Sequence, residues 1–139
     1  MPKVFDRSAG PRSRSRDLLL GTAGAGAADA RDLVREVLEG GLDGRRTARP
    51  DSDVVLAVSE LVTNALRHCA GPARMRVVPR EDGLLVEVHD DSQNPARPRD
   101  AHSDGTGGYG LHIVEVLADR WGNRRTPRGK AVWALFAWR

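Results

Sequence analysis

Residues 51–69 read DSDVVLAVSELVTNALRHC, and their apolar side chains recur at the spacing of one helix face. Asp51 or Ser52 can cap the start of this helix, and Gly71-Pro72 ends it. Glu60 and Asn64 lie four residues apart and therefore share a face beside the deepest part of the stripe. We expect a long helix that buries the following residues: Val54, Val55, Val58, Leu61, Val62, Ala65, Leu66 and Cys69.

The flanking sequence contains further helix and strand patterns. Before the helix, residues 16–20 are predicted to form a short strand and residues 27–39 an amphipathic helix that ends at Gly40-Gly41. After it, runs at 73–79 and 84–88 flank Glu81-Asp82-Gly83, which is a strong hairpin signal. We expect a third helix at about 109–119 and a last strand at 130–138, with loops at 90–108 and 122–129.

This order of elements restricts the fold class. Helices do not alternate one-for-one with strands, which excludes a doubly wound parallel fold. We predict an α+β two-layer sandwich, with a mixed, mostly antiparallel sheet and helices on one face. The 139 residues fit one domain, which we place at residues 16–139 after a disordered tail at residues 1–15.

Composition excludes several functional classes. The only cysteine is Cys69, so no intrachain disulfide can form, and no apolar run approaches the ~20 residues of a membrane span. We expect a cytoplasmic protein with no membrane partner, and the Arg-, Ala- and Gly-rich composition indicates a high-GC bacterial source. The net charge is +3, but the charges are mixed. The one basic cluster, Arg12, Arg14 and Arg16, has no interleaved aromatics, so nucleic-acid binding is the least favoured hypothesis.

Three short segments could carry chemistry. On the helix at 51–69, the Asn64 amide oxygen could bind Mg²⁺, Glu60 could accept a proton, and Arg67 could reach a phosphate. Asp90 ends a strand and could accept a hydrogen bond from the amine of adenine, although it could equally start a turn. The Gly-rich segment GTGGYGL, residues 105–111, leads into the third helix, whose N-terminus is a natural phosphate seat.

Together the three segments resemble the N, G1 and G2 boxes of the GHKL superfamily, which includes gyrase-type and Hsp90-type ATPases, histidine kinases and anti-sigma-factor serine kinases. ELVTNA at 60–65 is similar to the N box, Asp90 stands at the G1 aspartate, and residues 105–111 resemble G2. The resemblance covers about residues 27–138. The short length, LVTNA at 61–65, and the endings ADRWG at 118–122 and GKAVW at 129–133 point to the anti-sigma-factor serine kinases.

The resemblance implies a Bergerat-type sandwich that binds ATP and Mg²⁺. Glu60 would be the catalytic base, Asn64 would hold Mg²⁺, and Asp90 would bind the adenine amine. It implies that the protein phosphorylates a serine of an antagonist protein, sequesters a sigma factor and forms a homodimer. The implied ATP-binding residues are Asn64, Arg67, Asp90, Ser92, Gly105, Gly107, Gly108, Gly110 and Leu111.

The chain departs from the family pattern at three positions. Ser92 and Asn94 occupy positions where the G1 box usually has glycine. Ala131 stands where a threonine of the last strand helps to bind adenine, which would remove one hydrogen bond worth ~1 kcal/mol. A non-catalytic ATP-binding partner-switching module is therefore the alternative to a kinase; Glu60 and Asn64 favour the kinase, and the three departures favour the module.

Overall fold

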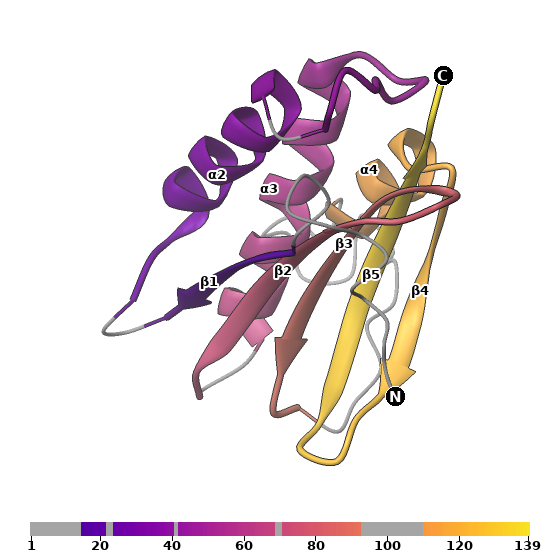
Figure 1. Ribbon diagram of the computed structural model, residues 1–139. Coiled ribbons are helices and arrows are strands. Elements are labelled where there is room, and N and C mark those ends of the chain that lie inside the picture. Colours follow the sequence, from indigo (N-terminus) through magenta and orange to yellow (C-terminus); the bar gives the residue numbers. More distant parts are fainter. Residues whose placement is uncertain (1–14, 22–23, 41, 69–70, 93–109) are drawn as a thin grey trace, which may run out of the picture.

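The computed structural model describes residues 15–21, 24–40, 42–68, 71–92 and 110–139. In chain order its elements are β1 (Arg16–Leu20), α2 (Ala27–Gly40), α3 (Asp51–His68), β2 (Ala73–Pro79), β3 (Gly83–Asp90), α4 (Gly110–Leu117), β4 (Arg120–Arg125) and β5 (Lys130–Ala137). Figure 1 shows the three helices packed together over a twisted sheet.

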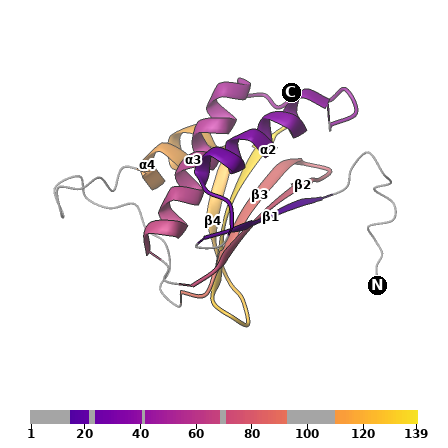
Figure 2. The same cartoon turned by 90° about the vertical axis from the view of Figure 1, so that its left-hand side faces the viewer.

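The sheet has the order β1-β2-β3-β5-β4, and the pairings between these strands are all antiparallel. In the view of Figure 2 the helices lie on one side of the sheet only, so the described part of the chain is a two-layer α+β sandwich. The predicted fold class is thereby confirmed. The described strands make an antiparallel sheet, and the parallel component is an isolated bridge between Leu20 and Ala25.

The core lies between the two layers. Residues of β2 and β3 alternate between the two faces of the sheet. Met75 and Val77 of β2 and Val86 and Val88 of β3 face the helices and are fully buried. From the other layer α3 contributes the apolar stripe expected from its sequence, with Leu61 only 1 % exposed. The helix that carries Glu60 and Asn64 is therefore fixed by the apolar face beside them.

The element predictions hold with one exception. The strand at 16–20 and the hairpin at Glu81-Asp82-Gly83 are confirmed. The exception is β4, because residues 122–125 were expected to be a loop and instead pair with β5 along the edge of the sheet. Most of the predicted tail, residues 1–14, lies outside the described residues, as does most of the loop predicted at 90–108.

Candidate functional site

Glu60 and Asn64 lie on α3 one helical turn apart, on a half-buried face. Neither side chain makes a hydrogen bond or an ion pair within the described residues, although both are only partly exposed. A half-buried carboxylate and carboxamide without protein partners are available to bind something else. Both groups thus lack hydrogen-bond partners among the described residues, as a nucleotide site would require.

The start of α4 lies against Glu60. A methyl group on Gly110, the first residue of α4, would come within 2.9 Å of Glu60 Oε1. The carboxylate therefore sits directly at the N-terminus of a helix, where backbone N–H groups lack intrahelical partners. Negative groups such as phosphates are stabilised at that position. The structure brings together the predicted N-box glutamate and the last glycine of the predicted G2 segment.

Asp90 is the last residue of β3, and its side chain faces the helix layer because it follows the buried Val86 and Val88 at the two-residue period of a strand. Its side chain is only 1 % exposed. Oδ1 accepts hydrogen bonds from the Ser92 backbone N–H at 2.8 Å and from Lys130 Nζ at 3.0 Å, and Oδ2 accepts from the same ammonium at 3.1 Å. Asp90 is thus both the start of a tight turn and half of a buried ion pair.

Close approaches join the ends of α3, β3 and β5. A methyl group on Gly71, three residues beyond the end of α3, would overlap the Asp91 side chain. A methyl group on Gly129 would overlap the backbone of Asp90 and Asp91. Figure 1 shows the same arrangement, since α3 and β3 both end, and β5 begins, at the lower end of the molecule. The Asn64 turn of α3 and the Asp90 end of β3 therefore border one region.

The sheet register corrects the expectation for Ala131. Asp90 pairs with Lys130, and His89 pairs with Ala131. Since successive side chains of a strand point to opposite faces, Ala131 points away from the helices and from Asp90. A threonine at 131 would not reach Asp90, so Ala131 removes no contact at this site. The side chain that faces Asp90 belongs to Lys130, which our sequence analysis missed, although it is one of only two lysines in the chain.

The remaining predicted residues are placed as follows. Arg67 lies exposed in the last turn of α3, and the Ser92 N–H already bonds to Asp90. The Leu111 side chain is buried in the core, so only its backbone could reach a ligand. Gly105, Gly107 and Gly108, together with Asn94, lie outside the described residues. Among the described residues no group of three or more His, Cys, Asp or Glu side chains could hold a metal ion.

The opposite face of the sheet carries a separate charged cluster. Glu87 Oε1 lies 3.1 Å from His89 Nε2, and Glu87 Oε2 accepts a hydrogen bond from Arg124 at 3.0 Å. Burial alone would raise the pKa of Glu87, but the hydrogen bonds and positive charge of His89 and Arg124 outweigh it and lower the pKa below 4.5. Because Glu87 lies between Val86 and Val88 in β3, this cluster faces away from Asp90.

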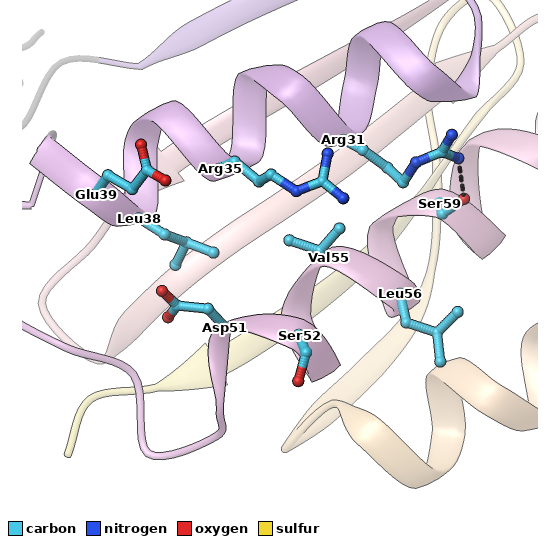
Figure 3. A pocket seen from close by; sticks show the side chains of 9 residues that line it. All are labelled: Arg31, Arg35, Leu38, Glu39, Asp51, Ser52, Val55, Leu56 and Ser59. Atoms are coloured by element: carbon cyan, nitrogen blue, oxygen red, sulfur yellow. Dashed lines mark hydrogen bonds between the residues drawn. The ribbon is translucent and has the colours of Figure 1, made fainter.

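A cavity of about 520 Å³ lies between α2 and α3. Figure 3 shows Arg31 and Arg35 toward one end of it and Glu39 and Asp51 toward the other, with Arg31 Nη1 donating to Ser59 Oγ at 3.0 Å. None of the predicted site residues lines this cavity. The predicted site is therefore the region around Glu60, Asn64, Asp90 and Gly110 rather than the cavity in Figure 3.

A two-layer α+β sandwich, with polar groups on a helix that have no described partner, a strand-end aspartate and a glycine at a helix N-terminus, fits a nucleotide-binding sandwich domain. Residues 23–136 match the family model of the histidine kinase-like ATPase domain. The match spans most of the chain, and the chain belongs to this family of ATP-binding domains. No curated protein matches the chain significantly. No helix among the described residues is long and apolar enough to cross a membrane.

Proposed function

We propose that the protein is an ATP- and Mg²⁺-dependent serine kinase that phosphorylates an antagonist protein and also sequesters a sigma factor, acting as a homodimer in the cytoplasm. The observation that carries the catalytic part is the pair of uncommitted side chains on α3, with the Glu60 carboxylate seated at the N-terminus of α4. The resemblance of the sequence to anti-sigma-factor serine kinases supports the choice of an antagonist protein and a sigma factor as partners.

The described residues fit a nucleotide. A carboxylate offers about four lone-pair sites, and hydrogen bonds from described residues use three of those of Asp90, which leaves one acceptor position on Oδ2 for the amine of adenine. The N–H groups at the start of α4 favour the phosphates, and Arg67 at the end of α3 adds a positive charge. Mg²⁺ held by the Asn64 oxygen would neutralise charge that develops on the phosphates.

Glu60 has the chemistry of the general base in this proposal. Its carboxylate lies against Gly110 and makes no hydrogen bond or ion pair with a described residue, so it can accept the proton of a serine hydroxyl. Phosphoryl transfer needs positioning and charge stabilisation more than covalent help from the protein. The chain therefore supplies one proton acceptor and a set of donors around the phosphates.

A non-catalytic ATP-binding partner-switching module is the second candidate. Two observations favour it: Ser92 replaces a glycine next to Asp90, and the Asp90 carboxylate already holds the Lys130 ammonium. Both affect the base end of the nucleotide and leave the phosphate end unchanged. A nucleotide held less firmly at its base is poorly positioned for phosphoryl transfer, and transfer is therefore the property that separates the two candidates.

The test is transfer of labelled phosphate from Mg-ATP to candidate antagonist proteins, together with calorimetry of ATP binding. We expect wild type to bind ATP and label a serine, and Glu60→Gln to bind ATP with little transfer. Glu81→Gln, in the exposed turn between β2 and β3, is the matched control for loss of a carboxylate. ATP binding without any transfer would favour the module. Normal transfer by Glu60→Gln would contradict the role of Glu60.

A further inference from the structure

Lys130 is the one buried cation among the residues that the structure describes, with a side chain 8 % exposed. Burying an ammonium is costly unless it is paired, and here both oxygens of Asp90 pair with it. The chain has 22 Lys and Arg residues but only two lysines. A compact ammonium therefore stands at the first position of β5, directly across the register from the strand-end aspartate.

Counting donors and acceptors shows what the pair still offers. An ammonium has three N–H donors, and two of them reach the two oxygens of Asp90, so one remains. Asp90 Oδ1 is filled by Ser92 N–H and Lys130, whereas Oδ2 accepts only from Lys130. Among the residues that the structure describes, one acceptor position on Oδ2 and one donor on Nζ therefore remain unused.

An adjacent acceptor and donor match one edge of adenine, where the exocyclic amine donates and a neighbouring ring nitrogen accepts. We propose that Lys130 is a second base-recognising residue: its ammonium donates to a ring nitrogen of adenine next to the amine, while Asp90 accepts from the amine. This inference rests on the proposed nucleotide site. It adds a specificity-determining residue to that site, on the side chain that our sequence analysis overlooked.

The alternative role for Lys130 is purely structural, as the counter-ion that makes burial of Asp90 tolerable. Replacing Lys130 would then weaken the binding of every adenine nucleotide equally, because only Asp90 would be disturbed. If Lys130 contacts adenine directly, its replacement weakens the binding of nucleotides that have the contacted ring nitrogen and does not weaken the binding of an analogue that lacks it. The two roles are separated by changing the protein and the ligand together.

The test measures dissociation constants of ATP, 1-deaza-ATP and 7-deaza-ATP for wild type and Lys130→Met by calorimetry. The two analogues each lack one of the two ring nitrogens beside the amine. We expect one analogue to bind wild type about ten-fold more weakly than ATP, as for loss of a charge-assisted hydrogen bond. Lys130→Met should bind that analogue and ATP equally. Arg125 lies opposite Lys130 in the β4–β5 register and is exposed, and Arg125→Met should keep the wild-type preference for ATP over that analogue.

The inference is overturned if neither analogue loses affinity for wild type, or if the loss is the same in Lys130→Met. If wild type binds no ATP at all, the proposed function fails instead, so the two failures are distinct. Should Lys130→Met not fold by circular dichroism, Asp90→Asn/Lys130→Met removes both charges and keeps an acceptor for the amine. That double variant is expected to bind ATP and both analogues with equal affinity, and retained discrimination would also refute the role of Lys130.

Discussion

Gly110 shows how a single missing side chain sets the position of the proposed base. An alanine here would place its methyl group 2.9 Å from Glu60 Oε1, so the carboxylate would have to move. The substitution should leave the fold intact, because alanine is favoured over glycine within a helix and the clash involves the flexible end of a side chain. We predict that Gly110→Ala lowers phosphoryl transfer on the order of a hundred-fold, as expected for a displaced catalytic group.

The measurement is single-turnover transfer of labelled phosphate, with thermal unfolding recorded in parallel. Gly40→Ala is the matched control, since Gly40 ends α2 and a methyl group there would meet no atom within 4 Å. The control should transfer phosphate at the wild-type rate. Unchanged transfer by Gly110→Ala would show that the position of the Glu60 carboxylate against α4 does not affect phosphoryl transfer.

Glu87 links stability to pH on the far face of the sheet. Its pKa is lowered in the folded protein from 4.5, because hydrogen bonds and positive charge from His89 and Arg124 outweigh the effect of burial. A lowered folded pKa means that the stabilisation is fully present above the unfolded value and is lost as the pH falls through the folded value. We predict that Glu87→Gln is less stable than wild type at about pH 7, and that the difference shrinks below about pH 4.

Urea unfolding at a series of pH values measures this difference. Glu81→Gln, in the exposed turn of the β2–β3 hairpin, removes a carboxylate without removing these contacts and should follow wild type. A stability difference for Glu87→Gln that is constant from neutral to acid pH would rule out the ionised carboxylate as its source.

At the scale of the element, α3 combines two functions on separate faces. One face supplies Leu61, 1 % exposed, to the core, and the neighbouring face holds Glu60 and Asn64 toward α4 and the end of β3. We predict that Leu61→Ala lowers the free energy of unfolding by roughly 2–5 kcal/mol, because it leaves a cavity between the layers. Leu56→Ala, on the same helix but 45 % exposed, should change it by less than about 1 kcal/mol.

Denaturant unfolding of both variants tests this division. If Leu61→Ala and Leu56→Ala lowered the free energy of unfolding equally, the face of α3 that carries Leu61 would not be the one packed in the core. Loss of ATP affinity in folded Leu61→Ala would in addition show that core packing positions the site.

The elements differ in how well the sequence predicted them. β3 and α3 were predicted because each carries a regular apolar pattern that its burial imposes. β4 was missed because an edge strand pairs on one side only and RWGNRR is largely exposed, so no alternation of apolar residues records it. The sequence of β4 resembles that of a loop, and the strand is held in place by tertiary contacts. It pairs with β5, and Ala137 N–H donates to Asp119 Oδ2, just before β4, at 2.8 Å.

At the scale of the whole molecule, the sequence predicted the class of site but not its electrostatics. The spacing of Glu60, Asn64, Asp90 and Gly110 matched a family pattern, and the structure brings their elements together. The sequence analysis placed the adenine-contacting position of the last strand at 131, because only the β3–β5 register decides that residue 130 faces Asp90. A shift of one residue in register exchanges the two faces of a strand, and linear spacing carries no such information.

Because the site draws α3 from one layer and β3 and β5 from the other, ATP should stabilise the molecule as one unit. At about 100 times its dissociation constant, a ligand that binds only the folded state adds about 2.7 kcal/mol to the free energy of unfolding. We predict this increase for wild type with Mg-ATP, measured by urea unfolding, and a smaller one for Asn64→Ala at the same concentration. Asn123→Ala, a carboxamide change in β4, should keep the wild-type increase. Stabilisation of Asn64→Ala equal to that of wild type would show that Asn64 does not contribute to nucleotide binding, because the increase depends only on the affinity of the folded protein for the ligand.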